Sequence, residues 1–190
     1  MSAPAPDGAR SEARELQRDA TATAAPLTPA AVAEITRVLS SVQTLALTMW
    51  AEGRSRLEPR RGWVPNPVAA MADVANVVVN RMNDPRWRRL SIKEICLQRA
   101  QFSCWLPIGG ADNYEALMRQ AQHLLAGDEP GHALCSCLDI ATACAAGTFR
   151  DRLDGATHYH ATWATPPRWT AAPARQVAER WGHRFYTSVR

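Results

Sequence analysis

Long apolar runs are missing from this chain of 190 residues. No run approaches the roughly 18 apolar residues that a membrane-spanning helix requires, so the sequence predicts no stable insertion into a membrane. The first segment, Met1 to about Pro26, is rich in Ala, Pro, Ser and Thr and lacks the continuous apolar stretch of a secretory signal. If the substrate lies outside the cytoplasm, we therefore expect a delivery route other than a cleaved N-terminal signal.

Paired cysteine motifs are also missing. The chain has five cysteines, and an odd number argues against a fully paired disulfide framework. Cys135 and Cys137 do not have the C-x-x-C spacing of common zinc sites, and no second pair accompanies them. Cys137 and Cys144 fall on one helical face, as small core residues would, so we expect buried free thiols.

Lysine is nearly absent, because Lys93 is the only one and arginine carries the positive charge. The formal net charge of +4 would attract a cell wall, a nucleic acid or a membrane surface alike, so charge does not choose the partner. With 46% hydrophobic and 21% charged residues, the composition predicts one globular domain. We place this domain at residues 27–190, after a disordered arm at 1–26.

Apolar periodicity predicts a mainly α-helical protein. Thr28-Pro29 is a helix start, and apolar residues then recur every three to four positions, so we expect one long helix to about Glu52. Glu52 extends the apolar stripe of this helix. Four further helices are expected, at Asn66-Pro67 to about Asn83, Ser91 to about Gln98, Asp112 to Gly127, and Ala133–Ala146.

The C-terminal segments differ from the rest of the chain. Thr157–His160 and Arg184–Thr187 are short, aromatic and β-prone, and predict a small hairpin or sheet joined through a proline-rich connection. The expected fold class is therefore α+β, mainly α-helical, with a small C-terminal β element.

Glu52 is the first candidate for chemistry. A glutamate on the inner face of a helix, beside Met49 and Trp50, would be partly desolvated, and desolvation favours the protonated form that a general acid needs. The alternative, which spacing alone favours, is an ordinary ion pair with Arg54, Arg56 or Arg60.

Histidines and tryptophans provide weaker candidates. His158 and His160 alternate along a strand, and with His183 they could supply three nitrogens to zinc, with an oxygen from Glu52 or Asp154. Structural or substrate-contacting histidines are the competing interpretation. Four tryptophans lie in expected loops or element ends, where they could stack on sugars or pack in the core: Trp63, Trp105, Trp163 and Trp169.

Five short segments follow one another along the chain: 51–54 (A-E-G-R), 74–81 (V-A-N-V-V-V-N-R), 98–103 (Q-x-x-Q-F-S), 155–160 (G-A-T-H-Y-H) with Trp169, and 182–186 (G-H-R-F-Y). Taken in this order, they resemble the SleB-like cell-wall hydrolases. The resemblance covers about residues 40–187. It implies a lysozyme-like fold and cleavage of the bond between N-acetylmuramic acid and N-acetylglucosamine.

The resemblance also implies site residues. Glu52 matches the essential glutamate of the family, and Asn80 and Arg81 match the end of the helix behind the site. Residues matching the other segments are expected to contact substrate: Gln101, Phe102, Tyr159, His160, His183 and Trp169. Peptidoglycan glycan strands are the expected partner, no nucleic acid, metal or cofactor is expected, and protein partners are not indicated.

The first of these segments departs from the family pattern. Ser55 stands where a second glutamate is usual, Glu58 is out of register, and Gly53 replaces a common alanine. Hydrolysis with two carboxylates needs a nucleophile or base across the sugar. A single acid fits a lytic transglycosylase better, in which the muramoyl C6 hydroxyl attacks the anomeric carbon.

Three alternatives remain at this point: a hydrolysing muramidase, a zinc-dependent amidase or peptidase using His158, His160 and His183, and a non-catalytic wall-binding module. The site of action is expected to be the periplasmic or extracellular wall. A phage or prophage endolysin, a component of a phage-like particle and a host enzyme exported without a signal would all fit.

Overall fold

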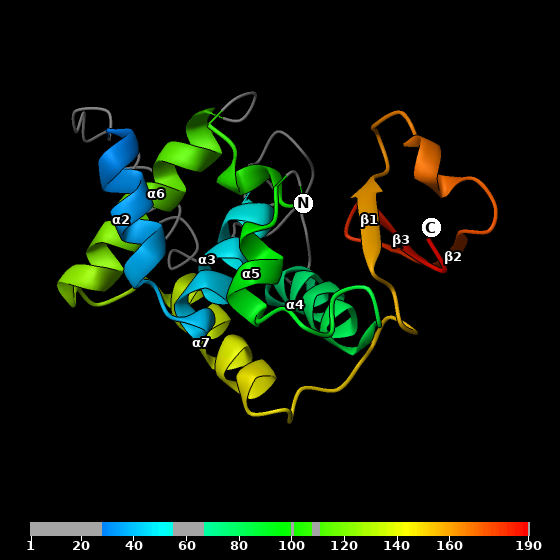
Figure 1. Cartoon of the computed structure of the whole chain (residues 1–190), viewed down its shortest axis with the longest axis horizontal. Helices are drawn as coiled ribbons and strands as arrows, with labels where there is room; N and C mark the ends of the chain where they lie inside the picture. The colour runs from blue at the N-terminus through cyan, green and yellow to red at the C-terminus, as the bar shows by residue number, and fades with distance from the viewer. Residues whose placement is uncertain (1–27, 55–66, 100, 108–110, 190) are drawn as a thin grey trace, which may run out of the picture.

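The computed structural model describes residues 28–54, 67–99, 101–107 and 111–189. The arm expected at 1–26 lies outside these residues. The described helices are α2 (Pro29–Val38), α3 (Ser41–Arg54), α4 (Pro67–Asn83), α5 (Ile92–Leu97), η2 (Ser103–Trp105), α6 (Ala111–Ala126), α7 (His132–Ala145) and η3 (Arg168–Thr170). The strands are β1 (His158–Ala161), β2 (Arg175–Arg180) and β3 (His183–Thr187). The expected class, mainly α-helical with a small C-terminal sheet, is confirmed (Figure 1).

The single long helix expected from Pro29 to Glu52 is wrong, because the chain leaves the helical conformation at Leu39 (φ −57°, ψ 135°). Ser40 and Gln43 explain the break. The Ser40 hydroxyl accepts from the Gln43 backbone N–H at 3.2 Å, and the Gln43 side chain accepts from the Ser40 N–H at 2.9 Å. This reciprocal cap starts α3 as a new helix. Lys93 then holds the end of α2 by donating to the carbonyls of Arg37 and Leu39.

Helix α3 forms the centre of the helical part and contacts α4, α5, α6 and α7. Its buried side chains include Leu45 and Met49, both fully inaccessible. Thr44 and Thr48 are buried among them, and each hydroxyl donates to the carbonyl four residues earlier, at 2.8 and 2.7 Å. The buried hydroxyls are therefore satisfied within the helix.

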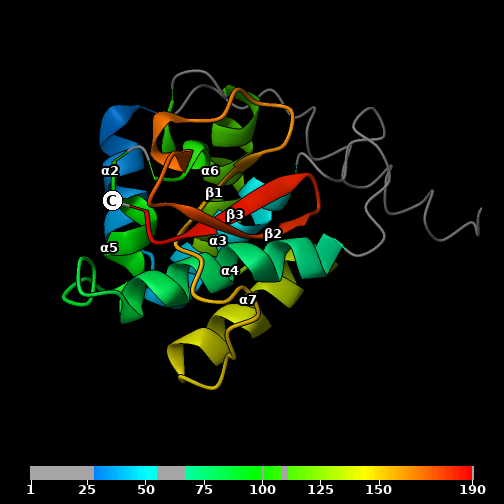
Figure 2. The same cartoon turned by 90° about the vertical axis from the view of Figure 1, so that its right-hand side faces the viewer.

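Helix α4 is buried on two faces, and even its polar residues Asp73, Asn80 and Arg81 are buried. One face, with Met71, Val74 and Val78, belongs to the helical core. The other face packs against the segment that leads to the sheet and against the sheet itself. Residues at helical spacing make up this second face: Asp73, Val77, Asn80 and Arg81. Figure 2 shows the sheet lying in front of α4.

The remaining helices follow their predicted signals. Ser91 caps α5, and the predicted capping box with Glu94 is present. Helix α6 ends before Gly127, whose φ of +83° is the left-handed conformation that glycine adopts without strain. Helix α7 covers the predicted segment to within one residue at each end. No helix among those described is long and apolar enough to cross a membrane.

The sheet has the order β1-β3-β2, and both pairs are antiparallel. The predicted hairpin segments are β1 and β3, whereas β2 falls in what was expected to be a connection. Side chains that pair across the sheet share a face. Tyr159, Phe185 and Ala178 pack with Val77 of α4. The opposite face carries His158, His160 and Tyr186, and Trp169 of η3 contacts all three rings.

Candidate active site

Glu52 lies in the last turn of α3 and is partly exposed to solvent. Three donors surround its carboxylate. The backbone N–H of Cys104 donates to Oε1 at 3.1 Å, and the Ser103 hydroxyl lies 3.3 Å from the same oxygen. The Tyr159 hydroxyl donates to Oε2 at 2.9 Å. Each carboxylate oxygen is therefore held by a group from a distant part of the chain.

The η2 turn supplies the donors to Oε1. Phe102 is buried at its start, and Ser103 on the turn is exposed. Trp105 at its end donates from its indole nitrogen to the Thr48 hydroxyl at 3.0 Å, one helical turn before Glu52. This bond attaches η2 to α3, and it therefore keeps the Cys104 N–H in position to donate to the Glu52 carboxylate.

Tyr159 supplies the donor to Oε2 from the middle of β1. Its ring packs against His183 at 4.9 Å and Phe185 at 5.8 Å between ring centres, and Phe102 lies 6.5 Å away. Burial, together with the neighbouring Glu52 carboxylate, raises the pKa of Tyr159 well above its usual value. The hydroxyl therefore keeps its proton and can donate to Glu52.

The Cys104 side chain is buried beside the same carboxylate. Burial raises the pKa of this thiol well above 9, and the Glu52 carboxylate acts in the same direction. A thiol that stays protonated is a poor nucleophile. The expectation of free thiols is met, and Cys96, Cys104, Cys137 and Cys144 are buried while Cys135 is partly exposed.

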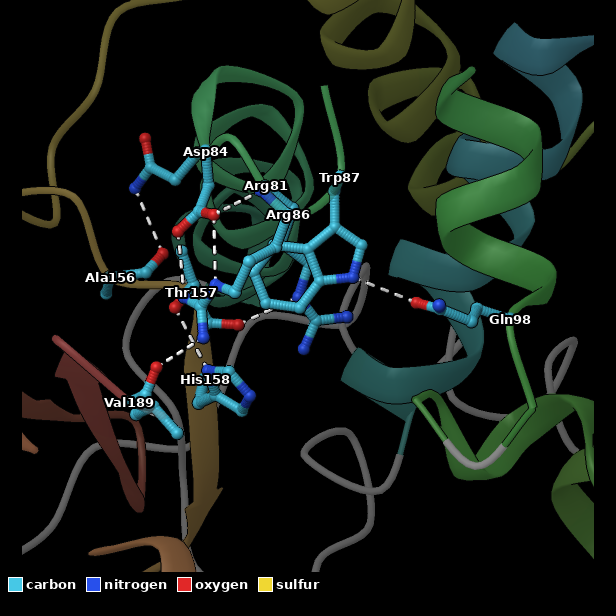
Figure 3. A network of polar contacts seen from close by, with 10 residues as sticks. Arg81, Asp84, Arg86, Trp87, Gln98, Ala156, Thr157, His158 and Val189 are labelled. Carbon is cyan, nitrogen blue, oxygen red and sulfur yellow. Dashed lines mark hydrogen bonds and ion pairs between the residues drawn. The ribbon is translucent and has the colours of Figure 1, made fainter. Parts of the chain in front are cut away.

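Arg81, at the end of α4, is 3% exposed and lies behind these groups. Its Nε donates to the Thr157 carbonyl at 2.8 Å, two residues before Tyr159 (Figure 3). Its guanidinium lies 5.3 Å from the ring centre of Phe102 and 5.4 Å from that of Trp87. Burial lowers the pKa of Arg81 to about 10, so the side chain remains charged at neutral pH.

The three histidines of the alternative zinc site are not brought together. His158 and His160 lie on the sheet face that Trp169 covers, whereas His183 packs against Tyr159 on the other face. Burial and the charges of Arg81 and Arg86 lower the pKa of His158 to about 4. No group of three His, Cys, Asp or Glu side chains in the described ranges is arranged to hold a metal ion.

The structure divides the predicted substrate-binding residues. Phe102, Tyr159 and His183 lie beside Glu52 or beside the groups that hold it, and of these Phe102 is 1% exposed. His160 and Trp169 contact each other on the far face of the sheet. Gln101 is partly buried and donates its backbone N–H to the Gln98 carbonyl.

Two groups at the site were not assigned from the sequence, the Ser103 hydroxyl and the Cys104 backbone N–H. Ser103 ends the Q-F-S segment, so its position in that segment was an available signal. A backbone N–H has no signature in a sequence, because every residue except proline carries one.

The structure explains why position 53 is a glycine. A Cβ atom at this position would lie 2.7 Å from Cγ of Met71 on α4, closer than real Cβ atoms approach. The glycine therefore permits the close approach of the two helices next to Glu52. Ser55, Arg56, Glu58 and Arg60 lie outside the described residues, as does the side chain of Arg54, so the predicted ion pair with Glu52 is not among the described contacts.

The sequence profile of the cell wall hydrolases matches residues 66–186, more than half of the chain. This match assigns the chain to a family of enzymes that act on the cell wall. The chain belongs to this cell wall hydrolase family, the SleB-like family that its segments resemble. No curated protein and no solved structure matches the chain. The lysozyme-like fold stays an expectation, and the matched range begins after Glu52.

Proposed function

We propose that the protein cleaves peptidoglycan between N-acetylmuramic acid and N-acetylglucosamine as a lytic transglycosylase, with Glu52 as its acid. The observation that carries the proposal is the set of donors around Glu52, since Tyr159, Cys104 and Ser103 hold a partly exposed carboxylate in one orientation. Acid catalysis needs a carboxyl group that is fixed in place and reachable by substrate.

The two carboxylate oxygens have different partners, and this supports a role in proton transfer. A backbone N–H can only donate, so Oε1 acts as an acceptor from Cys104. Oε1 also accepts from the Ser103 hydroxyl, whereas Tyr159 is the one described donor to Oε2, which leaves a lone pair of Oε2 to carry the proton. Oε2 is therefore the oxygen that we assign to the reaction.

In the proposed reaction, Glu52 gives its proton to the oxygen of the departing N-acetylglucosamine as the glycosidic bond breaks. The C6 hydroxyl of the muramoyl unit attacks the anomeric carbon and forms the new C–O bond. Its proton passes to the Glu52 carboxylate, which restores the acid. No water enters, and the product carries a 1,6-anhydromuramoyl end.

A single carboxylate supports this reaction over hydrolysis. Ser55 stands where the family usually has a second glutamate, and Glu58 is out of register with that position. Hydrolysis would need a second carboxylate or an equivalent group to act as nucleophile or to activate water. Transglycosylation needs only the acid and the hydroxyl of the substrate.

Tyr159 and His183 are the substrate-side residues that we retain from the sequence prediction, because both lie on the sheet face nearest Glu52. Their positions support contact with a glycan strand at the acid. For His160 and Trp169 we propose a supporting role instead, because they pack on the opposite face of the sheet.

Mass spectrometry of muropeptides released from purified sacculi tests the proposal. We expect anhydromuramoyl ends. Reducing ends would show a hydrolysing muramidase, and free stem peptides would show an amidase or peptidase. Binding to sacculi without any release would identify a wall-binding module. Any of these three results would overturn the proposed reaction.

A further inference from the structure

We propose that Arg81 is a positioning residue that sets both of the chain segments whose donors hold Glu52. The proposal rests on the function proposed above, and it assigns to Arg81 no contact with substrate. One guanidinium reaches the segment before Tyr159 and also the residue before Ser103 and Cys104.

The first segment is the entry to β1. Arg81 Nε donates to the Thr157 carbonyl at 2.8 Å in a fully buried contact, and the Thr157 N–H donates to the Tyr186 carbonyl at 2.9 Å. The Thr157 peptide groups are thus held from α4 and from β3. Because Tyr159 follows two residues later on a short strand, this contact fixes the depth at which its hydroxyl meets Glu52.

The second segment is the start of η2. The Arg81 guanidinium packs on the Phe102 ring, and Phe102 is buried immediately before Ser103 and Cys104. Phe102 also lies beside the Tyr159 ring. A guanidinium over an aromatic face is attracted to the ring quadrupole, and the attraction grows when water is excluded. Movement of Phe102 would carry the Cys104 N–H away from the carboxylate.

The electrostatic cost of this arrangement supports a functional role. Arg81 is buried, and within the described ranges it forms no ion pair with a carboxylate. Its Nη1 is buried and has no hydrogen-bond partner there. A buried charge without a counter-ion is unfavourable, and a neutral residue would fill the space at lower cost. The Arg81 charge lowers the pKa of Tyr159 and of Cys96, but burial raises both by more, so neither side chain becomes its counter-ion at neutral pH.

Asn80 provides a matched control. It precedes Arg81 on α4, is also buried, and its side chain donates to the Ala156 carbonyl at 3.1 Å, one residue before Thr157. Its second acceptor is Asp151, and no aromatic ring near Glu52 is among its described contacts. Loss of Asn80 therefore weakens the same junction of helix and sheet while the Arg81 contacts remain.

The test compares three variants, R81M, R81K and N80A, with the wild type. The measurements are the melting temperature, kcat and KM on soluble glycan strands, and the rate of hydrogen exchange at the Cys104 backbone amide. We expect kcat of R81M to fall by about 100-fold with KM unchanged, because a misplacement near 1 Å can cause such a loss. R81K keeps the charge and a donor for Thr157 but lacks the planar group for Phe102, so its kcat should fall by about tenfold.

The controls separate positioning from stability. N80A should lower the melting temperature as R81M does and leave kcat unchanged, and Cys104 amide exchange should accelerate in R81M and not in N80A. Equal losses of kcat in R81M and N80A, or unchanged kcat in R81M, would overturn the proposal. If R81M does not fold, the same comparison of kcat and Cys104 amide exchange is made between R81K and N80A. An unchanged kcat in R81K, or a loss equal to that in N80A, would then overturn the proposal.

The amide readout needs no substrate. If the wild type cleaves no glycan, the proposed function fails while the exchange rate still tests the placement of η2. If the wild type cleaves glycan and Cys104 exchange is the same in all variants, the positioning role fails alone.

Discussion

The hydroxyl of Tyr159 donates a 2.9 Å hydrogen bond to Oε2 of Glu52, across 107 positions of the chain. The bond joins the last turn of α3 to the first strand of the sheet, two elements that are built from separate parts of the chain. The arrangement around Glu52 therefore depends on the docking of the sheet against α4, through the packing of Val77 and the contacts of Arg81.

Removal of the Tyr159 hydroxyl should affect the reaction more than the fold. In Y159F the ring keeps its packing, but Oε2 of Glu52 loses its described donor. We expect kcat on peptidoglycan to fall on the order of 10- to 100-fold, because the acid is no longer oriented. Y186F is the matched control, because its hydroxyl contacts His160 and Gln176 on the opposite face. Equal effects of the two variants would contradict this role for Tyr159.

The contact between Gly53 and Met71 predicts a coupled pair. In G53A the new methyl group would overlap Met71, and we expect a loss of about 1 kcal/mol in the free energy of unfolding, since overpacking outweighs the better helix propensity of alanine. M71A should cost about 2–5 kcal/mol through the cavity it leaves. The double variant should lose less than the sum of the two. Additive losses in urea unfolding would show that the two positions do not meet.

A largely buried ion pair fastens the sheet to α4. Arg180 Nε lies 2.7 Å from Oδ2 of Asp73, and Arg180 also donates to Oδ1 at 2.9 Å. Burial raises the pKa of Asp73, and Arg180 opposes this rise. R180M leaves Asp73 buried without this cation, and we expect the free energy of unfolding to fall by about 2 kcal/mol at pH 7. This loss is smaller than that for a fully buried ion pair, because Arg180 is partly exposed.

Acid should reduce the effect of R180M, because Asp73 then takes up a proton and no longer needs the cation. Urea unfolding of both proteins at pH 7 and at pH 4 measures the difference. A loss that is the same or larger at pH 4 would contradict the assignment of Asp73 as the charge that Arg180 compensates.

His158 predicts a loss of stability in mild acid. Burial, then Arg81 and Arg86, lower its pKa to about 4, and Asp84 opposes this only in part. In the unfolded chain the imidazole binds a proton near pH 6.5, while the folded protein still excludes it. His158 therefore has no effect on the pH dependence of the free energy of unfolding above about pH 6.5. As the pH falls from about 6.5 toward 4, proton binding to the unfolded chain lowers that free energy.

Titration of the His158 ring by NMR checks this prediction directly. H158Q should flatten the dependence of the unfolding free energy on pH between about 6.5 and 4, because it removes one differential proton-binding group. A folded-state midpoint near 6.5 would contradict the burial that the structure assigns to this ring.

The sequence predicted most helices because their caps and apolar periods are local. It missed the break between α2 and α3, although Ser40 and Gln43 form a capping box, because the apolar period continues across the break. It missed β2 because this strand is largely polar, has an irregular register at Gln176–Ala178 and lies at the edge of the sheet. Its pairing with β3 depends on a tight turn at Trp181-Gly182.

The site was predictable in part for the same reason. Glu52 stood out because it lies on the apolar face of a helix, and Tyr159 because it lies in a segment that resembles the family. The separation of His158 and His160 from His183 depends on which faces β1 and β3 present, and that register is set by docking on α4. The joint contacts of Arg81 with Thr157 and Phe102 connect three segments, and no local pattern predicts them.

Glu52→Gln tests the central claim most directly. Glutamine has the same shape, so its oxygen can still accept from Cys104, but its amide cannot supply the proton. E115Q, on the exposed surface of α6, is the matched control. The measurement is the rate of anhydromuropeptide release from purified sacculi, together with sacculus binding and the melting temperature. We predict that E52Q binds and melts as the wild type does and releases product at least about 1000-fold more slowly, while E115Q is unchanged. Release by E52Q at the wild-type rate would contradict the account.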